Sequence, residues 1–305
     1  MTARRLFTPR IKVADLVDTN AHLLGILSRM GIPMGFGDAT VEETCQAHDV
    51  DLGTLLLICN MYTFKDYVPS EEEMTRLEPS LVVGYLKQSH RYYREEAIVT
   101  LAGMIERMLM PCEERRKRVI WRFFSDFTLE LEKHFVYEET FVFPFAEAII
   151  RGDTDSERFF QVEAEHTDIE AKLGDLKNII LKYPPSECSS ADIQQVLMMI
   201  YYLDEDLMRH NTIEDRLLGK EAPRQAHSAS SRPDGDELSA REKEILVCVA
   251  KGMLNKEIAD LYNLSIYTVI THRKNITRKT GIKSVAGLTI YALLNNLIDM
   301  NSVEG

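Results

Sequence analysis

Cysteine is scarce in this chain, and long apolar runs are missing. No two of its five cysteines form a C-x-x-C pair, so neither a disulfide framework nor a thiolate zinc site is indicated. No apolar segment approaches the roughly 18–20 residues that span a membrane, and the start of the chain lacks the apolar core of a signal peptide. We therefore expect a cytoplasmic protein without a membrane partner. The five cysteines are Cys45, Cys59, Cys112, Cys188 and Cys248.

Acidic residues outnumber basic residues in the whole chain, but this excess is not distributed evenly along it. The whole sequence has 36 Lys and Arg against 48 Asp and Glu, a net charge of −12. Residues 237–298 reverse this balance with nine basic residues against five acidic ones, and no acid occurs from 261 to 298. A basic stripe of this kind is the electrostatic pattern expected at nucleic-acid phosphates. The sequence thus predicts that its C-terminal part binds double-stranded DNA.

Apolar residues recur at intervals of three and four through the middle of the chain, which predicts long amphipathic helices. Four such helices are expected at roughly 80–110, 113–143, 156–182 and 190–218. Their short connections favour an up-down-up-down four-helix bundle and an all-α fold. The breaks between them are marked by residues that stop helices or build turns: Pro111, Pro144, Gly152, Asp153, Pro184 and Pro185.

A triplet of metal-ligand residue types occurs twice at one offset. His90, His134 and Glu138 recur 76 residues later as His166, His210 and Glu214. In each copy a His and a Glu are four residues apart, which puts both side chains on one helix face. Counting about 1.5 Å of rise per residue from each turn brings all four histidines to one level of the bundle. Four imidazoles and two carboxylates suit a pair of first-row metal ions such as iron, manganese or zinc, but not calcium.

Simpler interpretations fit these six positions less well. A lone histidine is more often a core or surface residue than a ligand, and His22, His48 and His227 are interpreted in that way. A structural zinc site usually closes with four ligands, and a haem takes only one or two axial residues, so neither uses all six. Metal binding at the duplicated positions is therefore the stronger prediction.

The motifs EKHFVYEETFVFP, EAEHTDIE and MRHNTIEDRLL resemble those of hemerythrin-like (HHE) domains over residues 78–221. This resemblance implies a non-haem di-iron centre, with Glu130 and Glu165 as acidic groups around the ligands. By arrangement the chain is similar to repair-of-iron-centres proteins, since residues 11–60 resemble their ScdA-type helical domain. Where that domain usually has a Cys-Cys pair, this chain has Met34, Gly35, Phe36 and Gly37.

The segments LSAREKEIL, NKEIADLYNLSIYTVITHRKNI and GIKSVAGLTIYAL resemble a LuxR-type (FixJ/NarL-like) helix-turn-helix domain. Ser239 with Glu242 predicts a capping box, and Ser265 an N-cap for the recognition helix. The resemblance implies that this helix enters the major groove and that a last helix, about 284–297, supports a homodimer. Ile270 stands where many members have a base-contacting Lys. The candidate DNA-binding residues are Tyr267, Thr268, Ile270, Thr271, Arg273, Lys274, Arg278 and Lys279.

Together these features predict a one-component transcription regulator that is not an enzyme. It would sense redox state, dioxygen or nitric oxide at its di-iron centre and alter DNA binding. The alternative is a di-iron protein for iron-centre repair, nitric oxide or peroxide handling, with an auxiliary DNA-binding domain. The expected domains are an ScdA-like domain at 1–77, the bundle at 78–221, a Pro-, Ser- and Gly-rich linker at 222–236 and the DNA-binding domain at 237–305.

Overall fold

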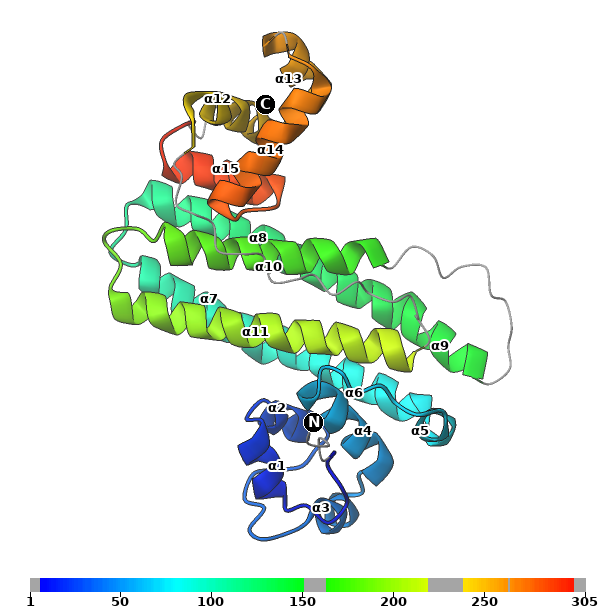
Figure 1. The fold of residues 1–305 in the computed structure, drawn as a ribbon. Coiled ribbons are helices and arrows are strands. Elements are labelled where there is room, and N and C mark those ends of the chain that lie inside the picture. The colour runs from blue at the N-terminus through cyan, green and yellow to red at the C-terminus, as the bar shows by residue number, and fades with distance from the viewer. Residues whose placement is uncertain (1–5, 151–162, 219–237, 263, 299–305) are drawn as a thin grey trace, which may run out of the picture. The chain divides into compact units, whose positions relative to one another are not determined.

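The computed structural model describes residues 6–150, 163–218, 238–262 and 264–298. All regular elements in these ranges are helices, apart from one isolated β-bridge between Lys12 and Thr40 (Figure 1). The prediction of an all-α fold is confirmed. No helix in this part of the chain is both long and apolar enough to cross a bilayer. The predicted linker at 222–236 lies outside the described residues.

The chain divides into two compact units, and each is described by itself. The first contains Met1–Val99, Phe135–Phe159 and Glu205–Pro223. The second contains Thr100–His134, Phe160–Asp204 and Arg224–Gly305. Because these units cut across the long helices, they do not test the predicted domain boundaries, which stay a prediction.

Five short helices open the first unit and enclose an apolar core. The third of them begins with the predicted capping box, in which the Glu43 amide donates to Thr40 Oγ1 at 3.2 Å and the Thr40 amide donates to Glu43 Oε2 at 2.9 Å. Leu16, Leu23 and Ile58 have no exposed surface, so the small amphipathic helices pack as expected. The helices are α1 Val13–Thr19, α2 Leu23–Arg29, α3 Val41–His48, α4 Leu52–Thr63 and α5 Glu71–Arg76.

The first long helix contains a π-helical insertion. It consists of α6 (Pro79–Tyr92), η1 (Tyr93–Ala97) and α7 (Ile98–Leu109). Its overall span confirms the predicted helix at 80–110. Single π turns inside α-helices occur often at functional sites, and this one begins three residues after His90.

A second π-helical turn lets a proline remain inside a helix. The sequence predicts that the second long helix ends at Pro144, but η2 (Glu138–Val142) is followed without a break by α9 (Phe143–Ile150). Proline in a regular α-helix clashes with the carbonyl four residues earlier, whereas a wider π turn shifts that carbonyl away. The predicted break at Pro144 was wrong for this reason.

The second unit contains the remaining parts of the long helices. They belong to α7, α8 (Glu114–Tyr137), α10 (Glu163–Lys182) and α11 (Ser190–Leu217), close to the predicted ranges. The predicted helix start at 156 and the predicted turn at Gly152 and Asp153 lie outside the described residues. Each of the four helices contributes apolar side chains to one buried core, which satisfies the amphipathic pattern of the sequence. The core residues include Leu101, Ile105, Ile120, Phe123, Phe127, Leu173, Leu176, Ile180, Val196, Ile200 and Leu203.

Four further helices form the C-terminal part of the second unit: α12 (Ala240–Ala250), α13 (Asn255–Tyr262), α14 (Ile266–Thr280) and α15 (Val285–Leu294). Ser239 and Glu242 form the predicted capping box, and Ser265 caps α14. Gly281 ends α14 with a φ of 73°, a conformation that glycine adopts without strain. The short turn from α13 to α14 confirms the predicted helix-turn-helix.

Candidate functional site

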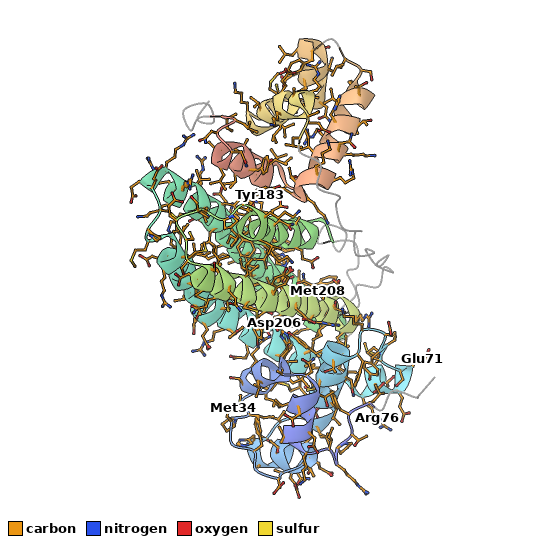
Figure 2. All side chains as sticks on the ribbon, turned by 60° about the vertical axis from the view of Figure 1, so that its left-hand side comes forward. Met34, Glu71, Arg76, Tyr183, Asp206 and Met208 are labelled. Carbon is orange, nitrogen blue, oxygen red and sulfur yellow. The ribbon has the colours of Figure 1, made fainter. Side chains whose placement is uncertain are left out.

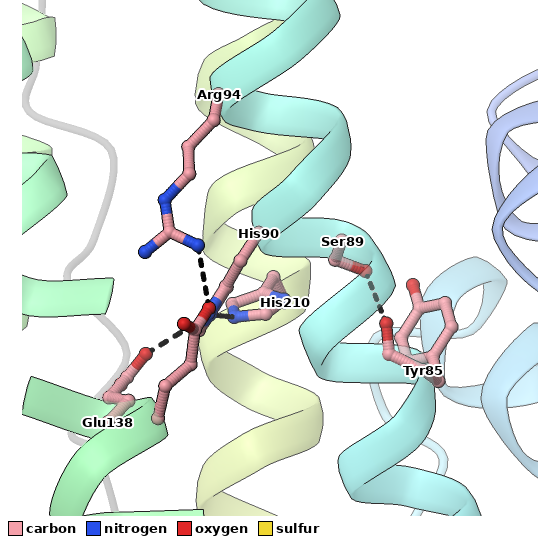
Figure 3. Close-up of polar contacts among 7 residues, drawn as sticks. Tyr85, Ser89, His90, Arg94, Glu138 and His210 are labelled. Atoms are coloured by element: carbon pink, nitrogen blue, oxygen red, sulfur yellow. Dashed lines mark hydrogen bonds and ion pairs between the residues drawn. The ribbon is translucent and has the colours of Figure 1, made fainter. Parts of the chain in front are cut away.

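Three of the six predicted metal ligands converge in the first unit. His90 of α6, Glu138 of η2 and His210 of α11 each offer a ligand atom, and these atoms all lie within 4.8 Å of one another (Figure 3). His90 Nε2 is 3.2 Å from His210 Nε2 and 3.2 Å from Glu138 Oε2. All three side chains are buried. The cluster therefore gathers two imidazoles and one carboxylate out of contact with water.

Glu139 fixes the orientation and the tautomer of His90. Its Oε1 lies 2.9 Å from His90 Nδ1 and 2.7 Å from Arg94 Nη1. The hydrogen bonds from His90 and Arg94 lower the pKa of Glu139 to about 2, so it is a carboxylate that accepts the Nδ1 proton. The Nε2 lone pair of His90 then points into the cluster. A histidine that binds a metal usually donates its other ring N–H to such an acceptor, so the residues fit a metal ion.

Aromatic rings enclose the two imidazoles. The His90 ring stacks on Phe135 with centroids 4.0 Å apart and on Phe143 at 5.4 Å. Tyr93 meets His210 edge to face at 5.6 Å. These contacts hold the rings in place and exclude water, which strengthens the electrostatic interactions inside the cluster.

For the other three predicted ligands, the structure gives the burial of two side chains and leaves the third undescribed. Glu214 is buried on α11, one helical turn after His210, and His134 is buried on α8, four residues before Glu138. His166 lies in α10, but its side chain is outside the described residues. Among the described residues, the group of ligand atoms within 4.8 Å of one another contains His90, Glu138 and His210 only. Their role as ligands stays a prediction.

The sequence predicted Glu130 and Glu165 as the acidic groups around the ligands, but the acidic group that contacts His90 in the structure is Glu139. Glu130 forms an ion pair with Lys172, and the side chain of Glu165 is not described. Sequence reasoning missed Glu139, which bonds His90 instead. Its position next to Glu138 in the YEETF motif was the available signal. The π turn that begins at Glu138 includes Glu139 as its second residue.

A buried ion pair supports the helices that carry His90 and His210. Arg29 of α2 donates from Nη2 to Asp206 Oδ2 at 2.5 Å, and the Tyr62 hydroxyl donates to the same carboxylate. Asp206, which is labelled in Figure 2, lies on α11. Arg29 also donates from Nη1 to Ser89 Oγ at 3.3 Å. Ser89 precedes His90, and Asp206 lies four residues before His210, so this network contacts both ligand helices.

Replacing Glu139 with Gln should weaken metal binding by about 10–100-fold, the usual effect of losing the acceptor behind a ligand histidine. The amide keeps the size of the side chain but loses the charge that holds the Nδ1 proton. A chelator-competition titration of the loaded protein measures the change. Glu130→Gln is the matched control, since Glu130 pairs with Lys172. Equal affinities for the two variants would remove Glu139 from the site.

The predicted DNA-binding face lies on α14. Thr271, Lys274 and Arg278 are exposed at helical spacing, while Val269 and Ile276 on the opposite face are fully buried. Ile270 is half-buried. The exposed stripe follows the helical spacing of the sequence pattern, and its contact with a DNA groove stays a prediction.

The remaining candidates on α14 take part in the fold of the domain. Arg273 donates to Asn255 Oδ1 at 2.7 Å, and Lys279 donates to Glu242 Oε2 at 2.9 Å. The Thr268 amide donates to the capping Ser265 hydroxyl at 3.0 Å. The side chain of Tyr267 lies outside the described residues. A role of these four residues at DNA stays a prediction.

Within the second unit, one stripe of α10 contacts the ends of two helices of the DNA-binding part. Asp175, which is buried, accepts from the Lys283 and Ser284 amides at 2.8 and 2.7 Å, at the start of α15. Asn178 and Lys182 donate to the Gly281 and Thr280 carbonyls at 2.8 and 2.9 Å, at the end of α14. An acid therefore faces a helix N-terminus and a cation faces a C-terminus, as the helix dipoles favour.

Comparison with known families assigns both functional regions. The hemerythrin HHE cation-binding domain matches residues 81–222, which contain the whole His90 cluster. The LuxR family of bacterial regulatory proteins matches residues 236–292, which contain α12 to α14. The chain thus joins a hemerythrin HHE domain to a LuxR-type DNA-binding domain. The hemerythrin domain implies a metal-binding site, typically a di-iron site, and the LuxR-type domain implies binding to DNA.

Curated proteins similar to this hemerythrin–LuxR chain are named as regulatory proteins. The chain is 43% identical over 63 residues to the transcriptional regulatory protein MctR of Rhizobium johnstonii, covering 21% of this chain and 29% of MctR. It is 34% identical over 87 residues to LiaR of Bacillus subtilis (28% and 41%), and 34% identical over 124 residues to the oxygen regulatory protein NreC of Staphylococcus carnosus (40% and 54%). The chain therefore spans 29–54% of the length of these relatives. The resemblance of residues 11–60 to ScdA-type domains stays a prediction.

Proposed function

We propose that this protein is a one-component transcription regulator whose hemerythrin domain senses redox state, dioxygen or nitric oxide and thereby alters DNA binding. The observation that carries this proposal is the buried His90–Glu138–His210 cluster, with the His90 tautomer fixed by Glu139, in a chain that also has a LuxR-type domain. A buried ligand set of this kind serves a regulator only if a change at the metal reaches the DNA-binding helices.

The proposed ligands are the six duplicated residues, which would hold a pair of iron ions. When bound, the metal pair supplies redox chemistry and sites for a diatomic ligand or an oxidant. Glu139 and the stacked ring of Phe135 keep the His90 imidazole oriented. The ligands are His90, His134, Glu138, His166, His210 and Glu214.

Two helices support a path from this site to DNA. The α10 helix carries His166 nine residues before Asp175, which caps the start of α15. The α11 helix carries His210 and Glu214 close to its end at Leu217, a few residues before the predicted linker. A shift of either helix with the metal state would change how the DNA-binding part is held, which is the differential contact that allosteric coupling requires. A homodimer supported by α15 would read two half-sites.

Operator binding in reduced and oxidised states tests this proposal. For the native protein we expect affinities that differ by about 5–150-fold between the states, the usual range of coupling energies. The His210→Ala variant should lose this difference because it lacks a ligand. Asp175→Asn should keep its metal but show a smaller difference, because the uncharged Asn oxygen accepts more weakly from the Lys283 and Ser284 amides. Equal binding by the native protein in both states would contradict sensing, and turnover of nitric oxide or peroxide would then favour the repair or detoxification alternative.

Lys274→Ala should weaken binding to all DNA sequences and lower the salt slope of binding by about one unit, because one phosphate contact is lost. Lys274 is exposed on the α14 stripe. Binding isotherms measured over a series of salt concentrations give the slope. Lys251→Ala removes an equal charge from an exposed position after α12 and should leave the slope nearly unchanged. An identical slope for the native protein and Lys274→Ala would exclude this lysine from the phosphate contacts.

A further inference from the structure

Two cysteines that are far apart in the sequence meet in the second unit. The Sγ atoms of Cys112 and Cys188 are 3.3 Å apart, and both residues are free thiols. Cys112 lies between α7 and α8, and Cys188 lies between α10 and α11. Each cysteine therefore immediately precedes one of the two helices that carry His134 and His210.

The separation of the two cysteines equals the offset of the duplicated metal triplets. Cys112 and Cys188 are 76 residues apart, as are His90 and His166. The repeat makes the turn between the first and second bundle helices equivalent to the turn between the third and fourth. In an up-down-up-down bundle these two turns lie at the same end. The repeat therefore supports the contact between the two thiols independently of the 3.3 Å distance between their Sγ atoms.

We propose that Cys112 and Cys188 form a reversible intramolecular disulfide, a second redox site built from residues other than the metal ligands. The sulfur atoms need to approach by about 1.3 Å to reach the S–S bond length of roughly 2.05 Å, which side-chain rotation can supply. The bond would join the turn before α8 to the turn before α11. It would close a loop of 76 residues.

The oxidation balances with a hydroperoxide as the oxidant. The thiolate of Cys188 attacks the peroxide oxygen, which breaks the O–O bond, releases an alcohol or water and leaves a sulfenic acid. The Cys112 thiol then attacks that sulfur and releases water as the S–S bond forms. Two thiols lose two electrons and two protons, and the peroxide is reduced by two electrons. A dithiol reductant reverses the reaction by exchange.

Accessibility decides which sulfur reacts first. Cys188 is half-buried, whereas Cys112 is buried, so the oxidant reaches Cys188 and Cys112 resolves the intermediate. Burial and the contact with Cys112 raise the pKa of Cys188 to about 12. Since the thiolate is the nucleophile, the reaction is slow at neutral pH and accelerates as the pH rises toward that value. Such a pair responds to sustained oxidation and not to brief exposure.

The turns that carry these cysteines also carry contacts of α8, α10 and the DNA-binding part. Arg116 donates to Glu187 Oε2 at 2.6 Å, joining the residue before Cys188 to the start of α8. Arg115 donates to the Ile298 carbonyl at 3.3 Å, and Tyr183 meets Tyr291 of α15 edge to face at 4.9 Å. A disulfide at this position would restrain the surface that contacts α15, so its formation is expected to change DNA affinity as well as stability.

The other three cysteines provide internal controls. Cys45, Cys59 and Cys248 are buried. Burial raises the pKa of Cys45 to about 11 and that of Cys59 further, and Cys248 donates to the Tyr262 hydroxyl at 3.7 Å. They should stay reduced under conditions that oxidise the Cys112–Cys188 pair.

The test uses the full chain, reduced, freed of reductant and treated with hydrogen peroxide or diamide. We expect the loss of two thiols per chain, one disulfide-linked peptide pair containing Cys112 and Cys188 in a non-reducing digest, and a rise in Tm of about 5–10 °C that dithiothreitol reverses. Cys112→Ser and Cys188→Ser should abolish the linked peptides and the rise in Tm. Cys248→Ser should behave as the native protein.

Three results would overturn the proposal: a disulfide between other cysteines, a disulfide only between chains, or oxidation of both thiols to sulfinic acids without a link. The His90→Ala variant, expected to be deficient in metal, separates this proposal from metal-based sensing. If the disulfide still forms in that variant, the thiol pair acts independently of the metal. If it forms only in the metal-loaded native protein, the pair is not a redox site of its own and the proposal fails.

Discussion

Replacing Arg29 with Met is expected to lower the free energy of unfolding by about 3–5 kcal/mol, the usual cost of breaking a buried ion pair by removing one partner. Arg29 and Asp206 have side chains that are 3% and 0% exposed. Methionine fills most of the volume but leaves the Asp206 carboxylate with its desolvation cost and without its cation. Urea denaturation, with the midpoint and slope both measured, gives the change.

A second variant and a surface control make this prediction specific. Arg29→Met combined with Asp206→Leu should recover most of the loss, because an apolar pair of similar volume often equals a buried ion pair in stability. The exposed pair of Arg76 and Glu72 is the control, since Arg76→Ala should change stability by less than about 1 kcal/mol. A loss for Arg29→Met no larger than that of Arg76→Ala would show that the buried pair does not stabilise the ligand helices.

Replacing His210 with Ala is expected to lower metal affinity by at least about 100-fold, more than the loss of an outer acceptor such as Glu139. The Nε2 atoms of His210 and His90 lie 3.2 Å apart in the cluster. Truncating either histidine to Ala therefore removes one group that would bind the metal directly. Metal content after gel filtration against a chelator measures the loss. His90→Ala should give the same result.

The control for these variants is His48→Ala. His48 is exposed at the end of α3, outside the cluster, and its loss should leave the metal content unchanged. Circular dichroism of each variant establishes whether the helices remain. Full metal content in a folded His210→Ala protein would exclude His210 as a ligand, and with it the central role of the cluster.

The helical architecture could be predicted because its signals are local. The spacing of apolar residues predicted the long helices. Capping residues such as Thr40 and Ser239 predicted the first residues of their helices to within one position. These signals act between neighbours three or four residues apart, where sequence alone fixes the geometry. The duplicated offset of 76 residues added a long-range constraint, and it predicted His90, Glu138 and His210 from the sequence alone.

Features that depend on tertiary packing were missed. The Arg29–Asp206 pair joins residues 177 positions apart, and no periodic pattern links them. The π turns at Tyr93 and Glu138 differ from α-helix only by one inserted residue, so the apolar spacing did not reveal them. The turn at Glu138 also brought Glu139 to His90, although the sequence favoured Glu130.

The cysteine contact shows how a known signal can go unused. Zinc and redox motifs are recognised by cysteines that are close in sequence, and this pair is not. The offset already established for the metal ligands applies to Cys112 and Cys188 as well. Internal repeats therefore predict contacts between equivalent turns in addition to contacts between equivalent helices.

Metal analysis of the purified native protein, combined with its absorption spectrum in oxidised and reduced states, tests the central claim most directly. The His90, Glu138 and His210 cluster predicts a bound first-row metal, as a pair of iron ions per chain, with absorption bands that change on reduction and no haem spectrum. A folded protein that binds no metal after incubation with iron, manganese or zinc would contradict the account.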